Sequence, residues 1–285
     1  MSPKAQKTIL ITGCSSGIGA ASAAALRNRG WRVVAACRKP EDVARKQAEG
    51  YASVRIDYED SASVEAGHRE ALELLGGRLD ALFNNGAYAI PGMVEDLPRE
   101  ALEAIFAANL FGPHQLARLA LKTMRAQDEG RGAGRIVQCS SVLGFAAARA
   151  RGAYNSTKFA LEGLTDTLRL ELRGSPIKAI LIEPGPIATP FRANAALQYA
   201  RWIKPLTPDS FWRELYAKQV EPRLRGEGEK DRWELGPEAV AEILLRALEA
   251  REPRARYRVT FPTKAAAVMK RLLPQKAFDA VLAKA

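Results

Sequence analysis

The segment TILITGCSSGIG at residues 8–19 decides the fold. Its first five residues are apolar or β-branched, which is typical of a buried strand, and the alanine-rich stretch that follows residue 19 is typical of a helix. Glycines between a strand and a helix let the backbone approach a pyrophosphate closely, while the free N–H groups at the helix start attract its charge. We therefore predict a phosphate-binding turn made by Gly13, Ser15, Ser16, Gly17, Ile18 and Gly19.

The same turn also matches the pattern G-x-S-x-G, the nucleophile elbow of α/β-hydrolases, with Ser15 at the nucleophile position. Such an elbow follows a strand in the middle of a sheet, whereas only 12 residues precede Gly13. The two histidines, His68 and His114, both fall in predicted helices and complete no catalytic triad. The hydrolase interpretation is therefore disfavoured, and both histidines are interpreted as ordinary helix residues.

Short strand-like runs alternate with longer helix-periodic stretches, and this alternation predicts βαβ units. We predict an α/β fold in one domain over residues 1–285: a Rossmann-type, doubly wound parallel sheet of about seven strands with helices on both faces. The strands are expected to begin at Lys7, Trp31, Ser53, Leu79, Arg135 and Ile177, with a seventh from Tyr257 to Phe261. A helix is expected to begin near Glu238.

Composition narrows the class of protein further. Apolar residues make up 47% and charged residues 26%, as in soluble globular proteins. The three cysteines have no metal-ligand spacing, so we expect no metal site, no disulfide framework and a reducing, cytoplasmic location. The net charge of +11 favours anionic partners, but it is spread along the chain and accompanies no nucleic-acid-binding motif. We therefore expect no nucleic acid as partner.

The second predicted strand, WRVVAAC, ends in Cys37 and is followed by Arg38 and Lys39. In dinucleotide-binding folds an acidic residue at this place binds the 2′-hydroxyl of NAD, whereas cations accommodate the 2′-phosphate of NADP. Two cations and no carboxylate predict NADP(H) as cofactor, with a solvated basic loop as the alternative interpretation. Asp57, just past the third strand, is expected to meet the adenine edge.

A catalytic constellation is predicted from four residues. Tyr154 and Lys158 lie one helical turn apart, Ser141 ends the preceding strand and Asn109 lies inside the helix before that strand. A phenol can protonate a developing alkoxide if its pKa falls from about 10. A lysine ~5 Å away contributes roughly 3 kcal/mol at an effective dielectric near 20, or about two pKa units. The Ser141 hydroxyl can donate a hydrogen bond to the same substrate oxygen.

These motifs resemble the classical short-chain dehydrogenases/reductases over about residues 7–189. Segments such as CRKPEDV, GAYNSTKFALEG and LIEPGPI resemble the branch that contains retinol, 17β-hydroxysteroid and bacterial NADP-dependent aldehyde reductases. The resemblance implies a catalytic tetrad of Asn109, Ser141, Tyr154 and Lys158, in which Asn109 holds a water and Lys158 also holds the nicotinamide ribose. It further implies that PGPIAT contacts the nicotinamide carboxamide through Pro184, Gly185, Ile187 and Thr189.

One motif departs from the family pattern. The family's Asn-Asn-Ala-Gly after the fourth strand is Asn84-Asn85-Gly86-Ala87 here, beside the expected adenosine ribose. Asn85 and Gly86 are still expected to contact the cofactor. Ala87 brings a Cβ where the family has none, so the local backbone and the cofactor affinity are expected to be affected unless Gly86 absorbs the change.

Two C-terminal segments complete the predicted organisation. Residues 191–235 contain three of the four tryptophans and are interpreted as an insertion that covers an apolar substrate, or as a helical layer packed on the sheet. Residues 264–285 are expected to form a helical tail, broken at Pro274, that packs on its own domain or a sister subunit rather than on an acidic membrane. The resemblance also implies a homodimer or homotetramer.

The functional prediction is an NADP(H)-dependent oxidoreductase that transfers a hydride between nicotinamide and an apolar aldehyde, ketone or alcohol. Medium-chain or aromatic aldehydes are the first expected substrates, and retinoids or steroids are the next. The alternative is a protein that binds NADP(H) as a sensor or regulator without turnover.

Overall fold

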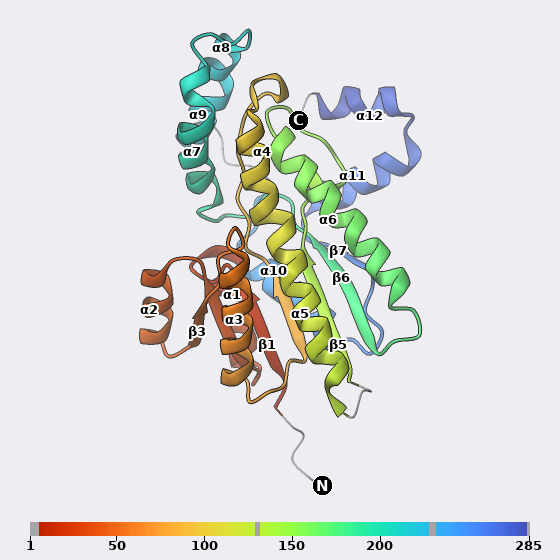
Figure 1. The fold of residues 1–285 in the computed structure, drawn as a ribbon. Coiled ribbons are helices and arrows are strands. Elements are labelled where there is room, and N and C mark those ends of the chain that lie inside the picture. The colour runs from red at the N-terminus through yellow and green to blue at the C-terminus, as the bar shows by residue number, and fades with distance from the viewer. Residues whose placement is uncertain (1–5, 129–131, 228–231, 284–285) are drawn as a thin grey trace.

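The computed structural model describes residues 6–128, 132–227 and 232–283. Seven strands of these residues form one parallel sheet in the order β3-β2-β1-β4-β5-β6-β7 (Figure 1). The strands are β1 (Thr8–Thr12), β2 (Arg32–Cys37), β3 (Ala52–Arg55), β4 (Ala81–Asn84), β5 (Gly134–Cys139), β6 (Ile177–Glu183) and β7 (Arg256–Arg258). The predicted doubly wound sheet in a single domain is confirmed.

Both faces of the sheet are buried and apolar. Successive side chains of a strand point to opposite sides, so each apolar strand contributes to both faces. Ile9 and Ile11 join one core cluster, whereas Leu10 between them joins the other. The first cluster packs under α1 (Gly17–Asn28), α2 (Pro40–Ala48) and α10 (Glu238–Glu249). The second packs under α3 (Ser61–Leu74), α5 (Gly112–Ala126) and α6 (Gly152–Glu171). The sheet therefore holds the carboxyl ends of its central strands rigidly at one edge.

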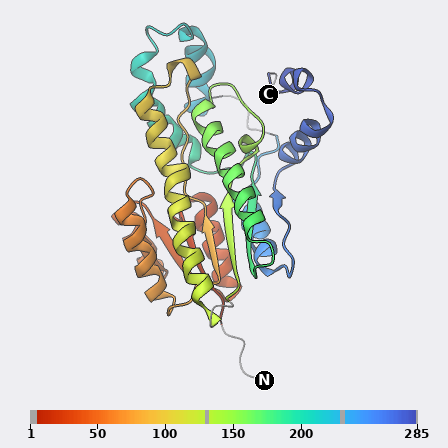
Figure 2. The same ribbon diagram turned by 45° about the vertical axis from the view of Figure 1, so that its right-hand side comes forward.

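Further helices lie beyond that edge, at the top of Figure 1. They are α4 (Arg99–Phe106), α7 (Phe191–Trp202), α8 (Arg213–Leu215), α9 (Glu221–Leu224), and the π-helical segments η2 (Ala107–Phe111) and η6 (Tyr216–Val220). In Figure 2, α4, η2 and α5 form one long helical column beside α6. A third apolar cluster joins these elements, and it contains Tyr154 together with Tyr199 and Tyr216.

The segment 191–235 is fastened to the short 3-10 helix η1 (Val94–Asp96) by a polar contact. The Tyr216 hydroxyl donates to Asp96 Oδ2 over 2.7 Å and accepts from the Met93 N–H over 2.8 Å. Ser210 Oγ donates to the same Asp96 oxygen over 2.8 Å. The aromatic side chains of this segment therefore pack a helical layer.

The seventh strand is shorter than predicted. It spans Arg256–Arg258, and Phe261 is already the first residue of α11 (Phe261–Leu272). Thr260 is extended and precedes this helix, and Pro262 in the first turn favours a helix start because its missing N–H has no partner there anyway. The predicted break at Pro274 is confirmed, since α12 (Gln275–Leu282) begins after it. Residues 284–285 of the predicted tail lie outside the described residues.

Candidate active site

The glycine turn joins β1 to α1 as predicted. Gly13 and Gly17 have left-handed backbone with φ of +68° and +55°, which glycine adopts without strain. A Cβ placed on Gly19 would lie 2.2 Å from the Gly13 carbonyl oxygen, so only glycine fits there. Ser15 and Ser16 complete the turn, and Ile18 packs against the first core cluster. The backbone at the start of α1 is thus closely approachable, which is what a pyrophosphate requires.

The Asn84-Asn85-Gly86-Ala87 segment supports this turn from β4. The Asn85 and Gly86 N–H groups donate to Thr12 Oγ1 over 2.9 and 3.2 Å, and Asn85 Nδ2 donates to the Thr12 carbonyl over 3.1 Å. Neither Gly86 nor Ala87 has a positive φ. Ala87 therefore needs no left-handed backbone, and the exchange of glycine and alanine causes no backbone strain at this position.

The residues predicted to select the cofactor lie around the end of β2. Arg38 and Lys39 are exposed, and Lys39 precedes α2, where its Nζ is 3.5 Å from Glu41. The Asp57 carboxylate caps its own loop by accepting from the Glu59 N–H over 3.2 Å. Arg45 was not predicted, yet its guanidinium donates to the Ser15 carbonyl over 2.9 Å. The sequence offered no spacing signal for it, because Arg38 lies before α2 and shares no helical face with Arg45.

Three of the four predicted catalytic side chains meet where β5 leads into α6. Ser141 lies just beyond β5 and begins the 3-10 helix η4 (Val142–Gly144), where its hydroxyl accepts from the Leu143 N–H over 3.1 Å. Tyr154 and Lys158 project from one face of α6, with Lys158 Nζ 5.5 Å from the Tyr154 ring centroid. Lys158 Nζ also donates to the Cys139 carbonyl over 2.7 Å. This contact ties α6 to the end of the Ser141 strand.

The pKa of the Tyr154 phenol differs from the expectation. Tyr154 is only 8% exposed, and burial, followed by the nearby Cys139 thiol, raises the pKa of its phenol while a hydrogen bond with Ser141 acts in the opposite direction. Burial also lowers the pKa of Lys158. Burial disfavours the charged form of both groups, so the phenol pKa lies above its ordinary value here, whereas the sequence argument expected it to fall toward neutrality. A protonated Tyr154 suits the role of proton donor.

Asn109 lies in the long helical column as expected, but in its π-helical part. Such π turns are frequent at functional sites. Its amide donates to the Tyr88 carbonyl over 2.8 Å and to Thr157 Oγ1 over 3.2 Å, and its Oδ1 accepts from the Tyr88 N–H over 3.1 Å. Asn109 thereby fixes the loop after β4 to the helix that carries Tyr154.

The PGPIAT segment after β6 connects the two halves of the site. The Pro184 carbonyl accepts from the Val142 N–H over 2.7 Å, next to Ser141. A Cβ on Gly17 would lie 2.9 Å from Thr189 Cγ2, so the same segment reaches the glycine turn. Gly185 is required because a Cβ there would lie 2.1 Å from Thr260 Oγ1, and Ile187 packs against the first core cluster.

Asn155 is a site residue that the sequence argument missed. Its amide donates to the Leu143 and Ala146 carbonyls over 3.0 Å each, so it holds the loop that follows Ser141. A polar side chain next to Tyr154 on a buried helix was the available signal. Over residues 6–128, 132–227 and 232–283, no group of three histidine, cysteine or acidic side chains is arranged to hold a metal ion. Nor does any helix in those ranges have the length and apolarity to cross a membrane.

An open parallel sheet with a glycine turn at its carboxyl edge defines the class of dinucleotide-binding α/β proteins. Residues 7–200 match the family described as short chain dehydrogenase, and the chain belongs to this family of oxidoreductases. Over 277 residues it is 40% identical to the uncharacterized oxidoreductase YbbO of Escherichia coli K12, which covers 97% of this chain and 94% of that protein.

Two further similarities bear on the site. The chain is 30% identical to retinol dehydrogenase 8 of Bos taurus, over 89% of this chain and 81% of that protein. It is 26% identical to a short chain dehydrogenase/reductase of Burkholderia phymatum solved in complex with NAD, with a TM-score of 0.76 and coverage of 94% and 92% of the two chains.

Proposed function

We propose that this protein is an NADP(H)-dependent oxidoreductase that transfers a hydride between the nicotinamide ring and a carbonyl or alcohol group. The observation that carries the proposal is the convergence of Ser141, Tyr154 and Lys158 beside a segment that also touches the glycine turn. The turn fits a dinucleotide, because Gly13 and Gly17 give it the left-handed backbone of a tight turn and it ends at the start of α1, whose free N–H groups can bind a pyrophosphate. When bound, the cofactor supplies or accepts the hydride.

The chain's own residues handle the proton and the substrate oxygen. The protonated Tyr154 hydroxyl donates its proton to the carbonyl oxygen during reduction and takes it back during oxidation. The Ser141 hydroxyl stabilises the charge that develops on the same oxygen. Lys158 orients the ribose and, while charged, favours the phenolate left behind. We assign Asn109 the role of holding a water molecule in the proton relay.

The preference for NADP(H) rests on Arg38 and Lys39, which stand exposed at the end of β2 with no acidic residue in the ribose position. Arg45, bonded to the Ser15 carbonyl, brings a third cation to the same end of the turn. Asp57 is assigned to the adenine edge, and Asn85 with Gly86 to the adenosine ribose. Because the Burkholderia phymatum relative was solved with NAD, the preference needs its own test.

Replacing Arg38 tests that preference. We expect Arg38→Gln to raise the KM for NADPH roughly 10- to 100-fold and to leave the KM for NADH unchanged, since a charge-assisted hydrogen bond contributes about 1.5–3 kcal/mol. The matched control is Arg32→Gln, an exposed arginine at the opposite end of the same strand. Equal KM values for NADPH and NADH in the native protein would contradict the role of Arg38.

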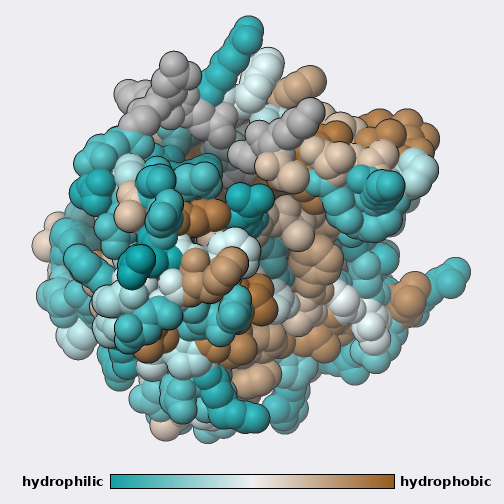
Figure 3. Space-filling model, turned by 90° about the horizontal axis from the view of Figure 1, so that it is seen from above, coloured by the Kyte–Doolittle hydropathy of each residue, from teal (hydrophilic) through white to brown (hydrophobic). Residues whose placement is uncertain are grey.

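We further propose that the substrate is an apolar aldehyde or ketone, or the corresponding alcohol. Tyr154 lies in an apolar cluster with Ala195, Tyr199 and Tyr216, which come from the segment 191–235. In the view onto this end of the molecule, hydrophobic surface runs between more hydrophilic regions on either side (Figure 3). We assign residues 191–235 as the cover of the substrate. Retinoids or steroids are the second substrate class, and the retinol dehydrogenase relative supports the retinoids.

The proposal is tested by following the loss of NADPH absorbance with a panel of medium-chain and aromatic aldehydes, ketones, retinal and ketosteroids, with NADH in parallel. We expect turnover of at least one apolar carbonyl and preference for NADPH. Tight NADPH binding without turnover of any of these carbonyls favours the alternative, a sensor or regulator.

We also propose an assembly and a location for the protein. Exposed Leu164 and Leu170 on α6 favour a homodimer or homotetramer built on this helix. The three cysteines are buried and unpaired, which fits a reducing compartment such as the cytoplasm. Helix α11 contacts both α12 and η4, so we assign the two tail helices to packing on the domain rather than to a membrane.

A further inference from the structure

A cavity of about 410 Å³ lies between α6, β6, β7 and α11, and none of the predicted catalytic or cofactor-binding residues lines it. The cavity lies next to the catalytic centre, since Gly144 and Phe145, which line it, belong to the loop that follows Ser141. Glu183 in its floor directly precedes Pro184. The volume falls within the range of small-molecule sites.

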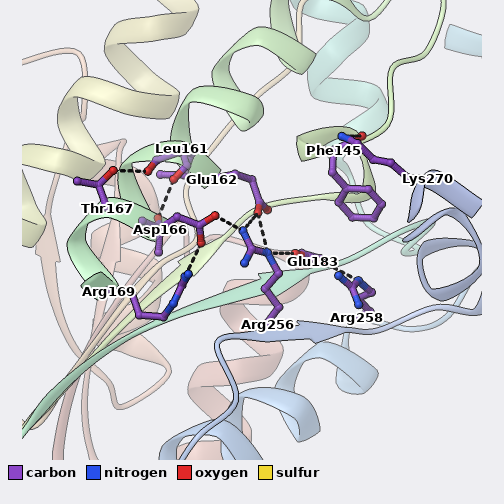
Figure 4. Close-up of polar contacts among 12 residues, drawn as sticks. Phe145, Leu161, Glu162, Asp166, Thr167, Arg169, Glu183, Arg256, Arg258 and Lys270 are labelled. Carbon is purple, nitrogen blue, oxygen red and sulfur yellow. Dashed lines mark hydrogen bonds and ion pairs between the residues drawn. The ribbon is translucent and has the colours of Figure 1, made fainter. Parts of the chain in front are cut away.

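The floor is a network of carboxylates around two arginines (Figure 4). Glu183, fully buried at the end of β6, lies 3.0 Å from Arg256 Nε and 2.9 Å from Arg258 Nε. Arg256 also pairs with Glu162 over 3.1 Å and with Asp166 over 2.6 Å. Burial and the neighbouring Glu162 raise the pKa of Glu183 to about 7. The floor carboxylates thus already share the two arginines.

The mouth of the cavity is cationic and aromatic. Lys270 Nζ lies 5.2 Å from the Phe159 ring centroid and donates to the Phe145 carbonyl over 2.6 Å. Arg258 lies 5.7 Å from the Phe145 ring centroid. Arg271, next to Lys270 on α11, is exposed and completes the rim. Four cations and two carboxylates line the cavity, so its charge favours an anion, while the two phenylalanines favour an apolar group beside it.

We propose that this cavity is a second ligand site, which binds a small amphipathic anion with its head group on Lys270 and Arg271 and its apolar part against Phe145 and Phe159. Cations placed beside aromatic rings suit such a ligand, because head group and apolar part find their partners side by side. The proposal is independent of the hydride-transfer reaction, since it concerns residues outside that centre.

Isothermal titration calorimetry of the full chain tests the site with octanoate as probe. Two further probes are 1-octanol, which has the apolar chain without the charge, and inorganic phosphate, which has the charge without the apolar chain. We expect saturable binding of one octanoate per chain and at least tenfold weaker binding of the other two probes. The double substitution Lys270→Gln with Arg271→Gln should weaken octanoate binding about tenfold or more, because two charge-assisted contacts are lost. The control Lys276→Gln removes an exposed cation of α12 outside the cavity and should change nothing.

The double variant also distinguishes octanoate binding in this cavity from octanoate binding in the apolar surroundings of Tyr154. Binding there would not depend on Lys270 or Arg271. Absence of saturable octanoate binding, or equal affinity in the native protein and the double variant, overturns the proposal. Equal binding of octanol overturns the role of charge, and equal binding of phosphate overturns the role of the phenylalanines. Phe159→Ala gives a second variant, at a half-exposed position, for which we expect weaker octanoate but unchanged phosphate binding.

Discussion

Tyr154→Phe is expected to lower kcat for carbonyl reduction by 10²- to 10⁴-fold, the usual contribution of general acid catalysis. The substitution removes only the hydroxyl, and the ring keeps its place in the apolar cluster with Phe191, whose centroid lies 5.5 Å away. The Kd for NADPH should change little, because the glycine turn and Lys158 remain. Steady-state kinetics and NADPH fluorescence titration of the two proteins give both values.

Ser156→Ala serves as the control for this substitution, since it removes a hydroxyl two residues away that donates only to the Ala153 carbonyl. Its kcat should stay within a few-fold of the native value. A Tyr154→Phe protein that keeps its native kcat would remove Tyr154 from the mechanism.

Gly19→Ala is the second change with a large expected effect. The added Cβ would lie 2.2 Å from the Gly13 carbonyl oxygen and 2.9 Å from Asn85 Nδ2, so the turn and its support from β4 must both shift. We expect NADPH binding to weaken at least tenfold and the melting temperature to fall, because displacing the backbone atoms of the turn costs free energy. Fluorescence titration and thermal unfolding measure the two effects.

The matched substitution is Gly163→Ala in α6, where an added Cβ meets nothing within 4 Å. Alanine is favoured over glycine inside a helix by about 0.5–1 kcal/mol, so this variant should be as stable as the native protein or slightly more stable. Native NADPH affinity in Gly19→Ala would show that the turn is not where the pyrophosphate binds.

Local patterns were sufficient to predict much of the fold and the centre of the site. Ile9 and Leu10 alternate between two cores, as a strand buried on both faces requires, and the glycines at the end of β1 have the conformations that a tight turn demands. Tyr154 and Lys158 share a helical face because of their spacing alone. Each of these features depends on residues close together in the sequence.

Contacts between residues that are far apart in the sequence were not predicted. Arg256 joins Glu162 and Glu183 across three elements, and Tyr216 meets Asp96 over a separation of 120 residues. The raised pKa of Tyr154 also depends on burial by several segments, which the lysine spacing alone does not show. The predicted end of the seventh strand was wrong because the helix start at Phe261 overrode the β-favouring residues before it.

In the proposed reaction, the chain transfers a hydride from NADPH to an apolar carbonyl at Tyr154. The most direct test is incubation of the native protein with NADPH deuterated at the transferable position of the nicotinamide ring, with the aldehydes, ketones, retinal and ketosteroids as acceptors. Mass spectrometry of the alcohol product should show one deuterium on the former carbonyl carbon, and none with Tyr154→Phe within the same time. Bound NADPH that delivers no deuterium to any of these acceptors would contradict the claim.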